Sequence, residues 1–295
     1  MTDPPPSPAP WLVDPELLRQ MRRAQAEEAF QAGKFDRALV EADELLADSP
    51  RDPGALWVLA RAALAIGDAC TAEVALDQLL DLDEAARPAP VGQIQTEMAF
   101  AQFLQADYAA ARSAAASALT MDRSLPAAWV CLGLAEERLG RTPEMVAAFD
   151  RAEALHPGSV PKRLPSPPPE TWTRLLQTAT QHLSEDESQL IHGLTVTWAP
   201  WPTPELLTSV EPPISPFIEV LIAGDDAPPT DPVDQLDAAL KQVVPSPTSI
   251  SIYTENLLRG QPSTADLVDR LVRAIRAELA AWLGIPPEEL NPELE

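Results

Sequence analysis

The feature that most constrains the fold is a helical pattern that breaks at regular intervals. Residues 16–157 are long stretches rich in Ala, Leu, Glu and Arg, with almost none of the alternation of β-branched and aromatic residues that is typical of strands. Aligning the short breaks between these stretches superimposes Gly33, Gly67, Ala106 and Gly140, at spacings of 34, 39 and 34 residues. A period near 34 residues is typical of helix-turn-helix repeats, so we expect four repeats and eight helices.

The residues around each break match as well, and the last repeat carries the fullest pattern. Its matching positions are Trp129, Leu132, Gly133, Gly140, Phe149, Ala152 and Pro157. Over about residues 17–157 the chain resembles the tetratricopeptide repeats (TPR), which implies a solenoid of stacked helix pairs. The 39-residue spacing reflects an insertion around residues 85–93, whose two prolines cannot continue a helix.

The TPR resemblance also implies a binding face. In this family the first helix of each pair lines a concave surface that binds peptides or helices of partner proteins. The side chains expected there are mostly apolar, which suits an amphipathic helix or an extended segment. Alternatively, another part of the chain covers them, such as Trp11 or the C-terminal domain. The expected binding residues are Phe30, Trp57, Arg61, Leu64, Phe100, Phe103, Val130 and Leu134.

TPR proteins that bind the acidic tails of heat-shock chaperones use a clamp of Lys, Arg and Asn on this face. Here the expected face has only scattered arginines, namely Arg23, Arg61 and Arg138. We therefore do not expect an acidic tail as the ligand.

Proline-rich segments divide the chain into domains. We expect a disordered leader over residues 1–15, the solenoid over 16–157, a semi-rigid spacer over 158–170 and an α+β domain over 171–295, because six prolines fall within residues 156–170. Within the last domain, composition predicts strands at residues 194–201, 217–224 and 248–254 and helices at 171–183 and 263–284. Residues 231–244 are expected to form a short helix or a structured loop.

Two stretches of the α+β domain resemble the minimal zincins, a small bacterial family of zinc-dependent peptidase-like proteins. One is ISIYTENLLR, residues 250–259, and the other is the end of the terminal helix, where that family has His-Glu-x-x-His. Ala277 and Ala281 stand at the two histidine positions, and Glu278 stands at the general-base position. Because two histidines one helical turn apart hold the zinc, the resemblance implies an inactive peptidase-like domain without metal or another cofactor.

Charge and remaining motifs exclude several classes of function. With 45 acidic and 21 basic residues the formal charge is −24, which disfavours nucleic acids and anionic membranes as partners. The two cysteines, Cys70 and Cys131, fall in helical segments and are expected to pack as small hydrophobes. The acidic run at residues 224–237 lacks the pattern of a calcium loop, and no nucleophile or nucleotide motif is present.

We therefore expect a non-catalytic adaptor that binds a protein or peptide through the concave face, the peptidase-like domain, or both. The alternative function is a zinc-dependent peptidase with non-standard ligands or with histidines from a second subunit. A further alternative is that the C-terminal domain docks on the solenoid and releases it when a partner binds. The N-terminal sequence lacks a basic region followed by an apolar run, so we expect a cytoplasmic protein.

Overall fold

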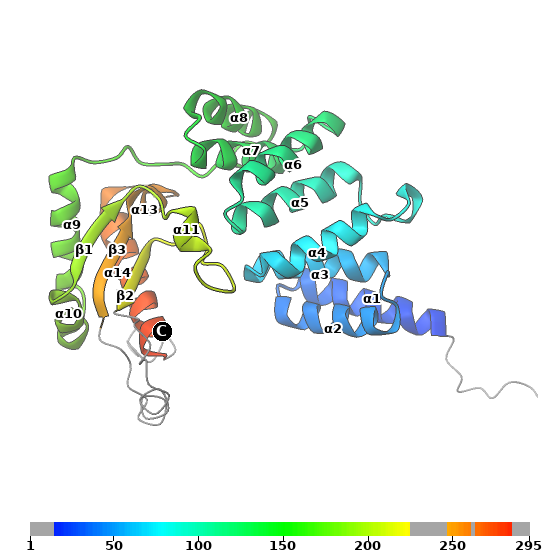
Figure 1. Ribbon diagram of the computed structural model, residues 1–295, viewed down its shortest axis with the longest axis horizontal. Coiled ribbons are helices and arrows are strands. Elements are labelled where there is room, and N and C mark those ends of the chain that lie inside the picture. The colour runs from blue at the N-terminus through cyan, green and yellow to red at the C-terminus, as the bar shows by residue number, and fades with distance from the viewer. Residues whose placement is uncertain (1–14, 225–246, 261–262, 285–295) are drawn as a thin grey trace, which may run out of the picture. The chain divides into compact units, whose positions relative to one another are not determined.

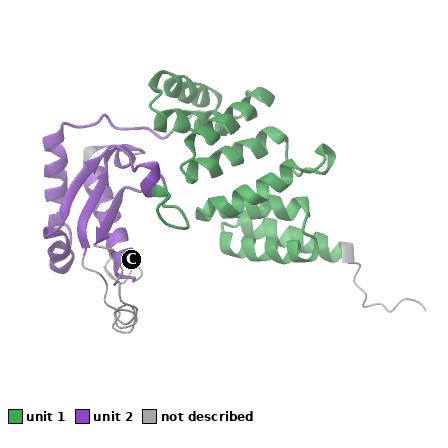
Figure 2. Cartoon of the chain, viewed as in Figure 1, with its two compact units in different colours: residues 1–160, 207–215 green, residues 161–206, 216–295 purple. Residues whose placement is uncertain are grey.

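The computed structural model describes residues 15–224, 247–260 and 263–284, which belong to two compact units (Figures 1 and 2). The helical unit contains the chain up to Val160 together with Leu207–Ser215. The sheet unit contains Pro161–Leu206 and the chain from Pro216 onward. Residues 1–14 of the expected leader and the expected helix or loop at 231–244 lie outside the described residues, whereas Pro15, the last residue of that leader, begins the first helix.

Helix pairs build the helical unit. Within the described part of this unit up to Val160, eight α-helices follow one another, and consecutive helices pack together (Figure 1). This confirms the predicted four pairs. The helices are α1(Pro15–Gln31), α2(Phe35–Asp48), α3(Pro53–Ile66), α4(Ala69–Leu80), α5(Val91–Leu104), α6(Tyr108–Met121), α7(Pro126–Arg138) and α8(Thr142–Leu155).

The turn inside each pair explains the predicted repeat register. Gly33, Gly67 and Gly140 have φ angles of 71°, 86° and 72°, and Ala106 has the same left-handed geometry at φ 62°. Glycine adopts this conformation without a steric penalty, which is why it recurs at the break. The second helix of every pair begins two residues after this position.

The insertion between the second and third pairs forms a capped connection. A short 3-10 helix, η1(Glu84–Ala86), follows α4. The guanidinium of Arg87, the residue after η1, turns back to the C-terminal end of α4. Its Nε and Nη2 donate to the carbonyl oxygens of Leu79 and Leu80 at 3.3 and 2.8 Å. These bonds satisfy carbonyl groups that a helix end leaves without an internal partner.

Small side chains let the helices of a pair approach closely. The alanines at matching positions are fully buried, and a Cβ added to Gly133 on α7 would lie 2.4 Å from a ring carbon of Phe149 on α8. The repeat core therefore depends on small residues at fixed positions as much as on large ones. The buried alanines that recur at these positions are Ala26, Ala60 and Ala99 on the first helices and Ala38, Ala72 and Ala111 on the second helices.

A three-stranded sheet with the order β1-β3-β2 forms the centre of the sheet unit. β1(Thr195–Ala199) runs parallel to β3(Pro247–Tyr253), and β2(Val220–Gly224) runs antiparallel to it. All three strands lie within or overlap the segments predicted to be strands. On β3, Ile250 and Ile252 are fully buried, whereas Ser249 and Ser251, which alternate with them, lie on the opposite face.

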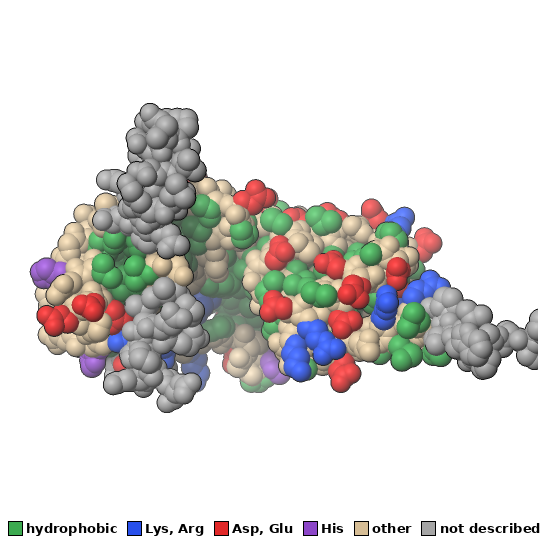
Figure 3. Space-filling model, turned by 90° about the horizontal axis from the view of Figure 1, so that it is seen from below, with side chains coloured by type: hydrophobic (Ala, Val, Ile, Leu, Met, Phe, Trp, Pro, Cys, Tyr) green, Lys and Arg blue, Asp and Glu red, His purple; other side chains and the backbone are tan. Residues whose placement is uncertain are grey.

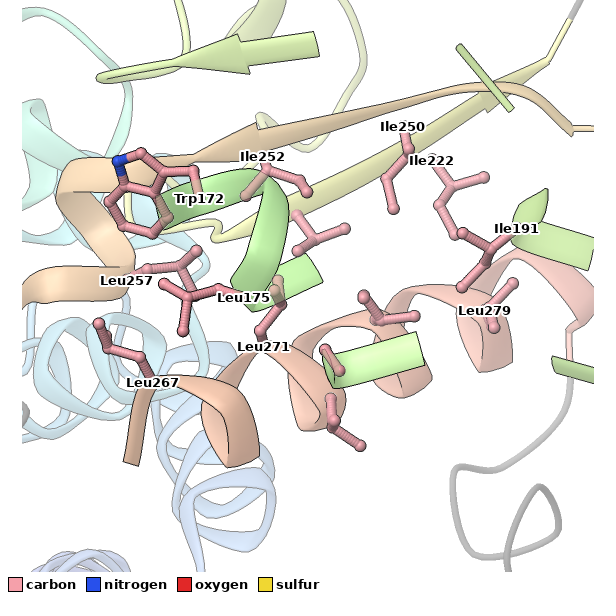
Figure 4. Packing of buried hydrophobic residues seen from close by; sticks show 14 of the residues in the cluster. Trp172, Leu175, Ile191, Ile222, Ile250, Ile252, Leu257, Leu267, Leu271 and Leu279 are labelled. Carbon is pink, nitrogen blue, oxygen red and sulfur yellow. The ribbon is translucent and has the colours of Figure 1, made fainter. Parts of the chain in front are cut away.

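Helices cover the isoleucine face of this sheet. α9(Pro169–Gln181) and α14(Thr264–Leu283) pack together and supply Trp172, Leu175, Leu271 and Leu279 to one cluster with the strand residues (Figure 4). The other helices in the described part of this unit are α10(Glu185–His192), α11(Pro204–Leu207), which ends where the unit boundary falls, and α13(Thr254–Leu258).

The proline-rich segment differs in part from the expected spacer. The backbone N–H of Leu164 donates to the carbonyl oxygen of Leu258 at 3.2 Å, and Arg163 forms an isolated bridge with Arg259. Helix α9 begins at Pro169, because proline is well suited to the first turn of a helix. Residues around 163 therefore belong to the sheet unit instead of crossing freely to it.

Candidate functional site

Three of the predicted binding residues on the first two pairs, Phe30, Trp57 and Arg61, form a compact cluster that we call the Arg61 cluster. The guanidinium carbon of Arg61 on α3 lies 3.9 Å from the ring centroid of Phe30 on α1 and 5.5 Å from that of Trp57. Arg61 also forms an ion pair with Glu27 at 3.6 Å. All four side chains are half-buried, so they remain partly accessible, and cation–π contacts hold them in one place.

Three of the four predicted residues on the third and fourth pairs line a pocket between α5 and α7, which we call the α5–α7 pocket. Its volume is about 490 Å³, within the range of natural ligand sites. The predicted residues Phe100, Val130 and Leu134 all contribute to its wall. The other lining residues are Thr96, Glu97, Pro126, Ala127, Cys131, His156 and Ser159.

Two predicted binding residues lie in the core instead. Phe103 is 0% exposed, and its ring lies 5.2 Å from that of Tyr108 on α6. The prediction that Phe103 contacts a partner is wrong for this structure, because its side chain fills the space between α5 and α6. Leu64 is only 8% exposed and packs similarly. Leu134 is also buried at 6% exposed, yet it reaches the pocket wall.

Glu97 was missed by reasoning from sequence. It stands three residues before Phe100, on the same side of α5, so the two side chains reach the same pocket. Burial raises the pKa of the Glu97 carboxyl, and the positive charge of Arg61 opposes this only in part. The available signal was a single acidic residue in the otherwise uncharged helix VGQIQTEMAFAQFL.

The other polar groups that line the α5–α7 pocket differ in whether they have a hydrogen-bond partner. The hydroxyl of Thr96 donates to the carbonyl oxygen of Gly92 at 2.8 Å. Cys131 is buried, and burial raises the pKa of its thiol to about 12, so it packs as a small hydrophobe, as predicted. The same prediction is wrong for Cys70, which is exposed. The hydroxyl oxygen of Ser159, in contrast, is buried without a hydrogen-bond partner among the described residues.

The peptidase-like positions lie on α14 of the sheet unit. Ala277 and Ala281 are exposed, whereas Glu278 is half-buried and accepts a hydrogen bond from the backbone N–H of Ile222 on β2 at 3.4 Å. Burial raises the pKa of Glu278, and this hydrogen bond opposes the shift. Across residues 15–224, 247–260 and 263–284, no group of three or more His, Cys, Asp and Glu side chains is arranged to hold a metal ion.

The surface charge is mainly negative. Figure 3 shows acidic side chains scattered among hydrophobic ones on one face of the helical unit, in keeping with the formal charge of −24. As for membranes, none of the helices in the described parts is long and apolar enough to cross a bilayer.

Comparisons with known proteins give likenesses to solved structures only. No family model and no curated protein matches the chain. A structure of MamA MSR-1 is 16% identical, with 49% of this chain and 80% of that chain covered and a TM-score of 0.41. A second MamA structure is 21% identical, with 45% of this chain and 75% of that chain covered and a TM-score of 0.40. TTC0263, a thermophilic TPR protein in Thermus thermophilus, is 23% identical with 47% and 74% covered and a TM-score of 0.40.

TM-scores this low carry no argument of their own, so the assignment of the repeat rests on the chain itself. Its period, its left-handed turn residues and its consecutively packed helix pairs make residues 15–155 a TPR-like helical repeat.

Proposed function

We propose that the protein is a non-catalytic adaptor that binds a partner protein through the first helices of its repeat pairs. The α5–α7 pocket is the observation that carries this proposal, since Phe100 and Val130 remain half-buried at its wall. A half-buried apolar wall is suited to burying one large side chain of a partner, and such anchors supply most of the free energy of a protein interface.

The Arg61 cluster supports a second contact on the same surface. Trp, Tyr and Arg are enriched among residues that dominate binding, and here Trp57 and Arg61 are held together with Phe30 before any partner arrives. Side chains that are already ordered lose less conformational entropy on binding. We propose an amphipathic helix or an extended segment as the bound element.

Site-specific crosslinking tests this proposal. A photoreactive benzoylphenylalanine at Val130 should form one dominant adduct with a protein in an extract of the native organism. The matched control places the same group at Val146 on α8, which is 46% exposed and does not line the pocket. Identical adducts from both positions, or none from Val130, would refute binding at the pocket.

We further propose that the sheet unit is a metal-free relative of the zinc peptidases. The support is the resemblance at residues 250–259 and the placement of Glu278 between two exposed alanines, Ala277 and Ala281, one turn apart. The double change Ala277→His and Ala281→His should create a zinc site stronger than any other pair of histidines on α14.

A matched control separates this result from the weak zinc binding of any histidine pair spaced by four residues. The variant Arg273→His with Ala277→His has the same spacing on the same helix, and Arg273 is exposed. Zinc binding would be measured by calorimetry on the full chain. Equal affinity of the two double variants would argue against a former metal site, and stoichiometric zinc in the unaltered protein would contradict the metal-free assignment.

A further inference from the structure

The α5–α7 pocket contains one charged group, Glu97, for which the described part of the helical unit supplies neither a hydrogen bond nor an ion pair. Glu97 is half-buried at the wall, and its carboxylate makes no hydrogen bond or ion pair with the described residues. A carboxylate withdrawn from water without a partner raises the free energy of the folded chain. The raised pKa of Glu97, caused by burial, reflects the same cost.

The nearest positive group does not remove this cost. Arg61 interacts electrostatically with Glu97, but its guanidinium is engaged with Glu27 at 3.6 Å and with the ring of Phe30 at 3.9 Å. Besides Glu97 and the buried thiol of Cys131, the ionisable side chain that lines the pocket is that of His156, which is exposed. A ligand that carries a positive charge could therefore form an ion pair with the carboxylate of Glu97.

The chain's own undescribed segments fit this pocket poorly in chemical terms. Residues 1–14 and 285–295 contain apolar and acidic residues but no lysine or arginine, and residues 225–246 contain a single lysine, Lys241. A second copy of the chain is also disfavoured, because two molecules of formal charge −24 repel each other. The same negative charge attracts a basic partner and raises its rate of association.

We infer that the α5–α7 pocket binds an apolar side chain from a basic amphipathic segment of a partner protein, and that a lysine or arginine of the same segment forms an ion pair with Glu97. This inference rests on the proposed adaptor function and specifies its partner. Phe100, Val130 and Leu134 supply the apolar contact, and Glu97 selects for the basic residue. The specificity is thus the reverse of a clamp for acidic tails.

Selection from a phage library of random dodecapeptides tests the inference with the full-length protein. The wild-type chain should enrich peptides in which Lys or Arg stands beside large apolar residues. Glu97→Gln keeps the size of the side chain but removes its charge, so it should lose this enrichment. Glu44→Gln is the matched control, since it removes one negative charge from an exposed position on α2 and should leave the selection unchanged.

A double-mutant cycle then tests the ion pair itself. In the best peptide, replacing the basic residue by norleucine should weaken binding to the wild-type chain about tenfold, and should change binding to Glu97→Gln little. Thermal unfolding followed by circular dichroism would verify that both variants fold. The wild-type loss should shrink as salt is added, because screening weakens partly exposed ion pairs.

The inference would be overturned by a lack of enrichment, by enriched peptides without a basic residue, or by equal losses in Glu97→Gln and Glu44→Gln. Enriched peptides that match residues 1–14 or 285–295 would identify the chain's own segment as the occupant and overturn it as well, as would self-association lost in Glu97→Gln. If crosslinking from Val130 still captures a partner, the adaptor proposal stands and only the basic segment fails. If the selection enriches no basic peptide and crosslinking from Val130 captures no partner, the adaptor proposal is also refuted.

Discussion

Arg276 on α14 donates a hydrogen bond from its Nε to the carboxylate of Glu187 on α10 at 3.0 Å, and this pair joins two helices that are 89 residues apart in the sequence. Glu187 is only 2% exposed, and it also accepts a bond of 2.6 Å from the backbone N–H of Ser184 as part of a capping box. The Nη2 of Arg276 donates to the carbonyl oxygen of His182 at 3.0 Å. One guanidinium therefore fixes the start of α10 against the terminal helix.

Removing Arg276 should destabilise the sheet unit. Arg276→Leu leaves a buried carboxylate without its cation, which typically costs about 3 kcal/mol. Hydrogen exchange measured by mass spectrometry should show faster exchange across α10 and α14 and little change in α1–α8. Arg273→Leu on the same helix is the control, because Arg273 is exposed. Equal effects of the two changes would show that the pair has no special role.

The ion pair between Glu187 and Arg276 also predicts that the sheet unit loses stability in acid. Burial would raise the pKa of Glu187, but hydrogen bonds from Ser184 and the bonds and charge of Arg276 outweigh it and hold the pKa below its ordinary value. A lowered folded pKa contributes stability that is present above the unfolded value of about 4.3 and is lost as the pH falls through the folded pKa. Glu187→Gln should therefore be less stable than the wild type at neutral pH. In urea titrations this difference should shrink toward acid pH, and a constant difference would contradict the prediction.

Ala106 should be replaceable by glycine with a gain in stability. It has φ 62°, whereas the matching positions Gly33, Gly67 and Gly140 have glycine. A residue with a Cβ pays about 1 kcal/mol in this left-handed region, so Ala106→Gly should raise the thermal midpoint of the helical unit. Gly67→Ala is the converse change and should lower it, although a Cβ there would contact nothing within 4 Å. A lower midpoint for Ala106→Gly would mean that burial of its methyl group outweighs the backbone term.

Local signals explain why the repeat could be predicted from sequence. A left-handed turn requires glycine or a tolerated substitute, so Gly33, Gly67, Ala106 and Gly140 mark the turns directly. The depth of each side chain is not local. Phe100 and Phe103 lie on one helix, yet Phe103 is fully buried because Tyr108 of the next helix packs against it. Sequence spacing gives the side of a helix but not what the following helix covers.

The sheet unit shows a similar limit. Its strands were predicted from β-rich segments, but the parallel pairing of β1 with β3 joins residues about fifty positions apart and leaves no local signal. The bond from Leu164 to Leu258 is equally non-local, so the proline-rich segment could be interpreted only as a spacer. Glu97 was missed for a different reason, since a single acid on a helix is ordinarily a solvated side chain.

Gly133 should not tolerate a larger residue. A Cβ at this position would lie 2.4 Å from a ring carbon of Phe149, so the Phe149 ring or the two helices would have to shift. Gly133→Ala should therefore destabilise the helical unit by about 2 kcal/mol, a typical cost of overpacking. Combining it with Phe149→Leu should recover part of the loss in thermal unfolding. If Gly133→Ala alone leaves the midpoint unchanged, the close approach of the two helices is not needed for stability.

Glu278→Gln should have the opposite effect to Glu187→Gln. Burial raises the pKa of Glu278, while the hydrogen bond from the backbone N–H of Ile222 opposes the shift. When the pKa of a carboxyl group is raised in the folded state, the charged form destabilises the folded protein. This loss of folding stability is absent below the unfolded pKa of about 4.3 and grows as the pH rises through the folded pKa. The glutamine keeps an oxygen that can accept from Ile222, so the variant should be more stable than the wild type at neutral pH and equally stable in acid. A loss of stability at neutral pH would show instead that the charge on Glu278 helps to hold β2 against α14.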